Sequence, residues 1–265
     1  MREVQTKLYG KIQEPENFLE LIELLTFLNV DDRNVHMWRG QSNINWRIDH
    51  SAYRRLRLDK NQITDSDLIN YEKNLLKQAS LKGYRQQNGR ILSDLELLAK
   101  LQHHGAATRL VDFTRNSLIA LWFASSENLE SDGLLIGLHT DFLGGYESEI
   151  QDYKYPFQLN ILDETNHALT FEPPVVTPRV AAQHSQFIYS SLSIKKTGSL
   201  KLHPDSEGSN KKPNLFISVK KELKQKINDI LEKSFDLRYQ TLFPDIDGFG
   251  DANSHQISKR KMWRW

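Results

Sequence analysis

Apolar residues recur every three or four positions in several stretches of the chain, which is the spacing of one helix face. The stretches that predict helices are residues 17–29, 65–82, 94–104, 116–125 and 220–235, and Ser51 is expected to cap a further short helix. Ser93 and Glu96 have the spacing of a capping box, in which side chain and backbone cap each other at a helix start. The stretch SLIALWFAS is almost wholly apolar, so we expect that helix to be buried.

Shorter runs of alternating or continuous apolar residues predict strands. These runs are residues 34–39, 108–113 and 133–139, with further strands expected in LTFEP, QFIYSS, SLKLH and NLFISV. Residues 140–170 show no clear period and predict an irregular excursion, whereas residues 205–213 have the composition of a loop. Strands and helices follow each other without a regular strand–helix–strand rhythm. The pattern therefore predicts one α+β domain with mixed or antiparallel sheets and surrounding helices.

The same pattern divides the chain into three parts. Residues 1–33 are expected to form a helical lead-in, and residues 34–250 the main domain. Residues 251–265 are a polar tail that ends in KRKMWRW, which is basic and aromatic.

Length and composition exclude some classes of protein. The chain has 265 residues, of which 38% are hydrophobic, so it can bury a core. Its net charge of +1 favours no particular partner. The absence of cysteine excludes disulfides, thiolate zinc sites and a cysteine nucleophile. The N-terminus lacks the apolar core of a signal peptide, and no apolar run approaches about 18 residues, so we expect a cytoplasmic protein without a membrane partner.

A first polar cluster lies in HMWRGQSNINWRIDHSAYRR, residues 36–55. Arg39 ends a predicted strand, and Gly40 allows the backbone to turn or to approach a ligand. Gln41 follows Gly40 directly, and the tryptophans Trp38 and Trp46 flank this stretch in the sequence. A fixed guanidinium among indoles and small polar groups suits a phosphate-bearing ligand with a planar ring. The alternative is an arginine paired with a structural carboxylate beside two core tryptophans.

A second cluster lies in LAKLQHHGAATRLVDFT, residues 98–114. Gln102 and His103 fall at the C-terminal end of a predicted helix, which a following glycine is placed to stop. Arg109 and Asp112 are predicted to point to opposite faces of a strand, so they should not pair with each other. We therefore predict Arg39 as one partner of Asp112. Adjacent histidines seldom bind one ion and no second ligand group has zinc-like spacing, so we expect no metal.

Two further clusters are RVAAQHSQF, residues 179–187, and QTLFPDIDGFG, residues 240–250. The second lacks the later ligands of an EF-hand, and its aspartates are expected to cap a turn. The sequence contains no GxGxxG, phosphate loop, GxSxG or HExxH, so common Rossmann, kinase and hydrolase interpretations lack support.

Taken together, the four clusters resemble the FRG domain family, named for a Phe-Arg-Gly motif that is Trp-Arg-Gly here. The resemblance extends from about Val35 to Gly248 and is most specific in the second cluster. The matching positions are Arg39, Gln102, His103, Gly105, Thr108, Arg109, Asp112, Gln183, Phe187, Asp245 and Asp247. The chain departs from the family pattern at His50, Ala106-Ala107, Phe113 and His184-Ser185. The resemblance implies that Gln102, His103, Arg109 and Asp112 share one site with Arg39.

An aromatic-Arg-Gly motif at the end of an early strand is also similar to the first motif of many ADP-ribosyltransferases. This weaker resemblance implies NAD as substrate and transfer of ADP-ribose to a macromolecular acceptor, a nucleic acid or a protein. FRG-type proteins also occur among bacterial toxins and phage-defence genes. The chemistry needs a grip on the pyrophosphate, an aromatic surface for nicotinamide, and a carboxylate that stabilises positive charge on the ribose.

We assign these roles to named side chains. Arg39 or Arg109 would hold the pyrophosphate, and Trp38 or Trp46 would stack on nicotinamide. The candidate catalytic residues are Arg39, His103, Arg109 and Asp112. The candidate binding residues are Trp38, Arg39, Gly40, Gln41, Trp46, Gln102, Thr108, Gln183 and Phe187. Asp112 is expected to organise the site, while the catalytic carboxylate stays open. The Glu147-Ser148-Glu149 triplet has the Glu-x-Glu spacing of many transferases but is expected to be a solvated loop, and the family pattern places Asp112, Asp245 and Asp247 better.

Two other functions stay open at this point. One is a non-catalytic FRG-type module that binds a nucleotide or a nucleic acid, for which the KRKMWRW tail supplies cations and two tryptophans. The same tail could instead contact an antitoxin or a chaperone. The other is a metal-independent hydrolase that uses His103 as general base.

Overall fold

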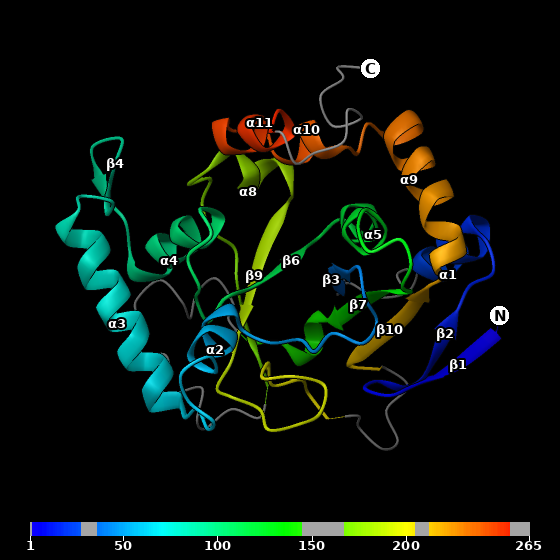
Figure 1. Ribbon diagram of the computed structural model, residues 1–265, viewed down its shortest axis with the longest axis horizontal. Coiled ribbons are helices and arrows are strands. Elements are labelled where there is room, and N and C mark those ends of the chain that lie inside the picture. The colour runs from blue at the N-terminus through cyan, green and yellow to red at the C-terminus, as the bar shows by residue number, and fades with distance from the viewer. Residues whose placement is uncertain (1, 28–35, 145–166, 205–211, 255–265) are drawn as a thin grey trace.

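The computed structural model describes residues 2–27, 36–144, 167–204 and 212–254 (Figure 1). Its strands are β1 (Arg2–Thr6), β2 (Gly10–Glu14), β3 (His36–Gln41), β4 (Gln86–Gln87), β5 (Arg90–Ile91), β6 (Val111–Thr114), β7 (Gly133–His139), β8 (Leu169–Phe171), β9 (Ser185–Tyr189) and β10 (Asn214–Val219). Its helices are α1 (Phe18–Phe27), α2 (Ser51–Leu56), α3 (Asp65–Leu81), α4 (Asp94–His103), α5 (Ser117–Ser125), α8 (Pro178–Ala182), α9 (Lys221–Phe235), α10 (Tyr239–Leu242) and α11 (Ile246–Ala252), with a short 3₁₀ turn at Thr140–Phe142.

Eight of the strands form one mixed sheet in the order β1-β2-β10-β7-β3-β6-β9-β8. Neighbours are antiparallel except β2 and β10, which are parallel. The fifth and sixth strands in this order, β3 and β6, share a single register pair, Trp38 with Thr114, and diverge from there. Strands β4 and β5 form a separate two-stranded sheet. The predicted α+β class with mixed or antiparallel sheets is thus confirmed, and the pairing of the large sheet is interrupted between β3 and β6.

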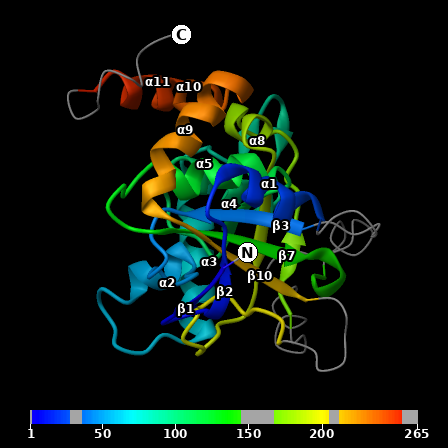
Figure 2. The same cartoon turned by 90° about the vertical axis from the view of Figure 1, so that its right-hand side faces the viewer.

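Helices cover one face of this sheet in two groups, α3 and α4 on the left of Figure 1 and α1, α5 and α9 on its right. Figure 2 shows α1, α5 and α9 above β3, β7 and β10. Helices α1, α5 and α9 bury an apolar cluster over β3, β7 and β10, which includes Trp38 and Leu135. Helices α3 and α4 bury a second cluster over β8 and β9, which includes Phe187 and Tyr189. Trp38, Asp112 and Phe187 lie on the same face because their strands are paired in register. The two helical groups therefore flank the diverging strands β3 and β6.

The opposite face carries a third apolar cluster that includes Ile48, Val111, Ile136 and Leu200. Loop segments cover it, since the backbone of Ile48 pairs with Thr197 and Leu200. Helix α2 follows these loops.

Most of the predicted helices and strands are present. The capping box at Ser93 and Glu96 forms, because their spacing acts within one helical turn. The stretch SLIALWFAS is a buried helix, as predicted, with the Asn116 side chain as its N-cap. SLKLH is not a strand, and only the isolated bridge between Leu192 and Leu200 forms there.

Two local predictions are wrong. Ser51 does not cap α2, because its hydroxyl donates instead to the Thr108 carbonyl at 3.0 Å. The N-terminal segment is not only helical, since β1 and β2 form a hairpin that joins the sheet beside β10. The hairpin lies at the edge of the sheet and is largely exposed, so its residues are mostly polar. Its sequence therefore lacks the alternating apolar positions from which strands were predicted.

Some predicted features lie outside the described residues. These are most of the expected excursion at 140–170, most of the loop at 205–213, and the KRKMWRW tail. Among the helices of the described ranges, none combines the length and apolar character needed to cross a bilayer.

Candidate functional site

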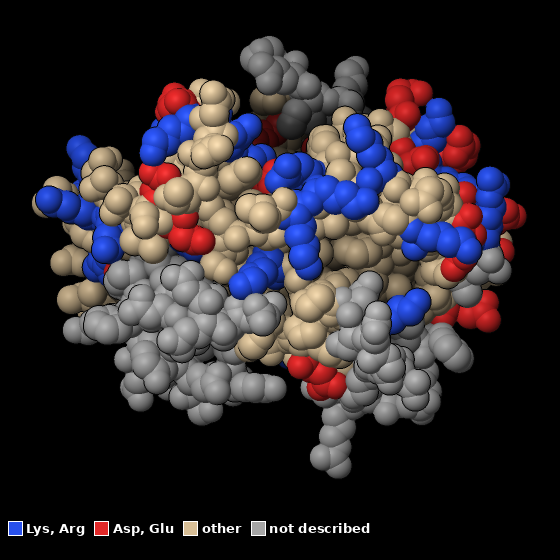
Figure 3. Space-filling model, turned by 90° about the horizontal axis from the view of Figure 1, so that it is seen from below, with Lys and Arg blue, Asp and Glu red and all other residues tan. Residues whose placement is uncertain are grey.

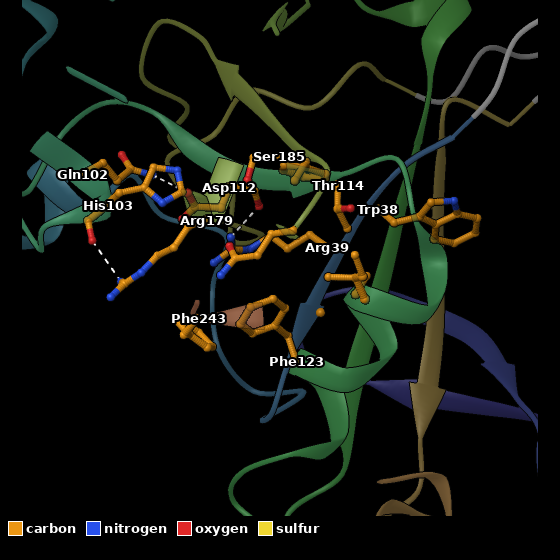
Figure 4. A pocket seen from close by; sticks show the side chains of 15 residues that line it. Trp38, Arg39, Gln102, His103, Asp112, Thr114, Phe123, Arg179, Ser185 and Phe243 are labelled. Atoms are coloured by element: carbon orange, nitrogen blue, oxygen red, sulfur yellow. Dashed lines mark hydrogen bonds between the residues drawn. The ribbon is translucent and has the colours of Figure 1, made fainter. Parts of the chain in front are cut away.

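A cleft of about 270 Å³ lies between the two helical groups, above the point where β3 and β6 diverge (Figure 4). Strands, helices and the C-terminal segment all contribute to it. Its lining residues are Trp38, Arg39, Gly40, Gln102, His103, Asp112, Phe113, Thr114, Ile119, Ala120, Phe123, Arg179, Gln183, Ser185 and Phe243. All four polar clusters of the sequence supply at least one of these side chains.

Arg39 bridges the gap between the two strands. Because side chains alternate along a strand, Arg39 leaves β3 on the sheet face opposite to Trp38. Its Nη1 nevertheless donates to the Asp112 carbonyl at 2.7 Å. Such a bond is possible only because β3 and β6 share no ladder beyond Trp38 and Thr114. The predicted contact between Arg39 and Asp112 therefore exists, although it reaches the backbone oxygen of Asp112 and not its carboxylate.

The surroundings of Arg39 favour an anionic partner. Burial lowers the pKa of the Arg39 guanidinium from its ordinary value, and the Asp112 carboxylate opposes this shift. The group still carries its charge near neutral pH, because its ordinary pKa is far higher. Its Nε is buried, and within the described parts of the chain no hydrogen-bond acceptor meets it. A buried cationic group of this kind is stabilised by an anion placed against it.

The wall opposite α5 is built by the C-terminal end of α4. Gly105, at φ +84°, lets the chain leave the helix in a left-handed conformation. Gln102 Nε2 donates to the Asp112 carboxylate at 2.8 Å, while Gln102 Oε1 accepts a short hydrogen bond from the Thr108 hydroxyl. Thr108 is fully buried and therefore orients Gln102 without lining the cleft.

His103 projects from the same helix end into the cleft. Its ring packs edge-on against Phe187, with 5.7 Å between the ring centroids. Burial lowers the pKa of His103, opposed by the Asp112 carboxylate and assisted by the Arg179 charge. His103 Nε2 is buried and finds no hydrogen-bond partner in the described ranges. The imidazole is thus neutral at pH 7 and able to take up a proton.

We expect the pKa of His103 to lie below 6.5 in an NMR titration of the folded protein, with His103→Gln identifying its signal. Because the folded state binds this proton more weakly than the unfolded chain does, protonation disfavours the fold. The free energy of unfolding should therefore fall as the pH drops from 6.5 toward the lowered pKa, by at most about 1.4 kcal/mol per pH unit. His103→Gln should remove this contribution. A midpoint above 6.5 would contradict the burial argument.

A third wall comes from the C-terminal half of the chain. Arg179 on α8 donates from Nη1 to the His103 carbonyl at 3.0 Å and from Nη2 to the Asp245 carboxylate at 2.8 Å. Its guanidinium lies 5.1 Å from the centre of the Phe243 ring. Asp245 in turn caps α11, accepting from the Gly248 amide at 2.8 Å. Arg179 therefore holds α4, α8 and α11 around one opening.

Sequence reasoning missed Arg179, Phe123 and Phe243 as site residues. Arg179 begins the third polar cluster, and its position directly after a helix-starting proline was the available signal. Phe123 and Phe243 look like ordinary core residues in the sequence. The structure leaves both rings partly exposed at the cleft, where they form its aromatic sides.

Neither of the two predicted stacking tryptophans presents its indole to the cleft, although Trp38 contributes to the lining. Trp38 is 2% exposed and its indole points away from the other labelled side chains, into the core under α5 (Figure 4). Trp46 is 47% exposed but lies in the loop after β3, outside the cleft. The neighbouring Gly40 is required by packing, because a Cβ there would stand 2.6 Å from the Ala124 amide nitrogen of α5.

Arg109 is not a cleft residue either. Its side chain is 1% exposed and pairs with Glu72 at 3.3 Å and with Asp65 at 2.9 Å, both on α3. It also donates to the Ser190 carbonyl at 3.0 Å. The expectation that Arg109 shares one site with Arg39 is therefore wrong, since two carboxylates hold Arg109 in the core.

The other predicted residues divide between the cleft and its support. Gln183 lines the cleft and donates to the Leu242 carbonyl at 2.9 Å. Phe187 is fully buried behind His103, and Gln41 is buried with its amide 3.4 Å from the Arg47 carbonyl. Asp247 pairs with His104 at 2.9 Å outside the cleft.

Two remaining points concern carboxylates and metals. Among the described residues that line the cleft, Asp112 is the one carboxylate. The Glu147-Ser148-Glu149 triplet lies outside the described residues. No group of three or more His, Asp or Glu side chains in the described ranges is arranged to hold a metal ion.

Comparison with known proteins adds one match. Residues 34–133 match the family model of the FRG domain. This range holds the β3, α4, β6 and α5 walls of the cleft and ends before the wall of Arg179, Gln183 and Phe243. No curated protein and no solved structure matches the chain. The likeness to ADP-ribosyltransferases is not shown by these comparisons.

Proposed function

The chain carries an FRG domain over residues 34–133, and we propose that its cleft binds NAD and transfers ADP-ribose to a macromolecular acceptor. One observation carries the proposal. Arg39 Nε and His103 Nε2 are buried on two walls of one cleft, and neither has a hydrogen-bond partner among the described residues. A buried polar atom left without a partner costs about 1–3 kcal/mol, and a bound ligand is one way to recover that energy.

The cleft combines the three features that NAD requires. Arg39 offers a fixed positive charge to a phosphate, and Phe123 and Phe243 add apolar ring surface to the lining for a planar group. The Asp112 carboxylate lines the same cleft. The cleft volume of about 270 Å³ is slightly below the roughly 300–1,000 Å³ of typical small-molecule sites. It therefore suits the nicotinamide riboside end of NAD, with the adenosine end at the mouth.

These positions support the following reaction. The glycosidic bond between ribose C1′ and the nicotinamide nitrogen breaks, and nicotinamide leaves with the bonding electrons. Asp112 stabilises the positive charge that develops on the ribose, and Gln102 holds that carboxylate in place. A nucleophilic oxygen or nitrogen of the acceptor then bonds to C1′ and gives its proton to neutral His103.

The proposal is tested by incubating the purified protein with NAD and measuring free nicotinamide, with and without RNA, DNA or bacterial lysate. We expect release above the buffer background with at least one acceptor, and ADP-ribose attached to that acceptor by mass spectrometry. Such an activity would suit a toxin or phage-defence effector. Absence of nicotinamide release with every acceptor would overturn the transferase proposal.

A non-catalytic nucleotide-binding module is the second candidate. It is favoured by the carboxylate of Asp112, which already accepts a hydrogen bond from Gln102 and has no second carboxylate beside it among the described cleft residues. In that case, NAD or ADP-ribose would bind and protect the protein against thermal unfolding without nicotinamide release.

A further inference from the structure

Basic residues concentrate on the face of the molecule that bears α2. Residues 47–60 and 193–201 contain eight Lys or Arg and two Asp, whereas the whole chain carries a net charge of +1. The rest of the chain is therefore net negative. Seen from this side, lysine and arginine side chains gather across the middle of the face (Figure 3). We define the basic face by its exposed members Trp46, Arg47, Arg54, Arg57, Lys195 and Lys196.

Backbone and side-chain contacts hold the two segments of the basic face together. The Ile48 amide donates to the Thr197 carbonyl at 2.8 Å, and the Leu200 amide donates to the Ile48 carbonyl at 3.0 Å. The Asp49 carboxylate accepts from the Ser199 amide at 2.6 Å. These bonds place the lysine loop directly beside the start of α2.

Two of the three arginines of the basic face, Arg47 and Arg54, contact Asp49. Arg47 Nε lies 3.3 Å from the Asp49 carboxylate, and Arg54 Nη1 donates to the Asp49 carbonyl at 2.8 Å. Arg57 follows Arg54 by three residues and so lies on the same side of α2. Asp49 and Asp59 can offset only part of this charge, because they are two carboxylates against the eight cations of these segments. The basic face is a preformed positive surface.

Trp46 gives this surface an aromatic edge. It immediately precedes Arg47, is 47% exposed, and lines no part of the cleft. An exposed indole beside fixed cations is the arrangement with which proteins stack an unpaired base and contact its flanking phosphates. A duplex would contact the cations but could not place a base on Trp46, because its bases are already stacked.

We propose that the basic face binds single-stranded nucleic acid, with a base on Trp46 and phosphates on Arg47, Arg54, Arg57, Lys195 and Lys196. This inference goes beyond the proposed function of the cleft and does not depend on it. The negative charge of the remaining surface would orient an approaching polyanion toward this face.

The test uses the full chain and a fluorescein-labelled oligothymidylate about 20 nucleotides long, which exceeds the roughly 4–16 nucleotides covered by small single-strand-binding domains. Binding is followed by anisotropy without NAD, so its outcome is independent of the cleft. Five phosphate contacts predict that log K falls with log salt with a slope of about −3.5, at about 0.7 for each contact to a single strand. Lys195→Ala with Lys196→Ala should reduce the slope by about 1.4.

Two variants separate charge from stacking. Trp46→Ala should weaken binding about tenfold or more while leaving the salt slope unchanged. It should leave the fold intact, because the fold uses the carbonyl of Trp46, which accepts from the Tyr9 hydroxyl. Lys221→Ala with Lys226→Ala removes the same charge from the exposed surface of α9 and should change neither affinity nor slope.

Three results would overturn the inference. The first is an equal loss of affinity in the α9 control and the Lys195 and Lys196 variant. The second is equal affinity for duplex DNA together with no effect of Trp46→Ala. The third is tighter binding to phosphatidylserine vesicles than to the oligonucleotide, which would assign the surface to membranes, since Ile194 is fully exposed beside Lys195.

Discussion

Arg39→Ala is expected to reduce nicotinamide release by about 100- to 1,000-fold. This is the loss seen when one fixed donor is removed from a charge-stabilising site. The side chain reaches the cleft through the gap between β3 and β6 and is held by the Asp112 carbonyl. Alanine removes the cation and leaves that carbonyl without its donor. The effect should appear both in nicotinamide release and in the affinity for ADP-ribose measured by calorimetry.

Two further variants separate the role of Arg39 in the cleft from a structural one. Arg39→Lys keeps the charge but loses the planar fork, so its activity should lie between the wild type and alanine. Arg115→Ala removes an exposed arginine that follows β6 and does not line the cleft, and it should leave activity unchanged. If Arg39→Ala remained folded and released nicotinamide at the wild-type rate, Arg39 would not hold the substrate.

Arg109→Met is expected to lower the free energy of unfolding by about 3–5 kcal/mol, measured by urea denaturation. Arg109 and Glu72 are both essentially inaccessible to solvent, and methionine leaves the Glu72 carboxylate buried without its charge partner. It also removes the ion pair with Asp65 and the bond to the Ser190 carbonyl. This is the largest stability effect that we expect from a single side chain.

The double variant Arg109→Met with Glu72→Gln tests the cause. Glutamine carries no charge, and its side-chain oxygen can still accept from the Arg109 backbone amide, which donates to Glu72 Oε1 at 2.6 Å. The double variant should therefore recover part of the lost stability relative to Arg109→Met. If Glu72→Gln instead added a further loss to Arg109→Met, the uncompensated charge would not be the main cost. A large loss of NAD binding in folded Arg109→Met protein would show that Arg109 takes part in ligand binding and is not only a structural residue.

The local parts of the fold were predictable because their causes act over a few residues. The capping box of Ser93 and Glu96 depends on contacts within one helical turn, and it forms where the sequence predicts it. The buried helix after Asn116 likewise forms where its apolar run predicts it. The β1–β2 hairpin was not predicted. Its strands are short and polar, and pairing with β10, far along the chain, recruits β2 into the sheet.

The residues of the cleft also divide into those that the sequence predicted and those that only long-range packing placed there. The sequence singled out Arg39, Gln102, His103, Asp112 and Gln183, and these side chains do meet at one cleft. It treated Arg109 as equivalent to Arg39, and Trp46 as equivalent to Trp38. Residue type alone could not separate them, since an arginine serves equally well to bind an anion or to neutralise a buried carboxylate.

From its sequence alone, the chain was assignable to an α+β domain with FRG-type motifs, because helix periods, caps and motif spacing are properties of neighbouring residues. Only the tertiary structure decided which guanidinium faces the cleft, which tryptophan is buried, and that Arg179 and Phe243 complete the walls. Those outcomes depend on which distant segments pack together. The carboxylates of α3 draw Arg109 into the core, and the divergence of β3 from β6 opens the gap that Arg39 bridges.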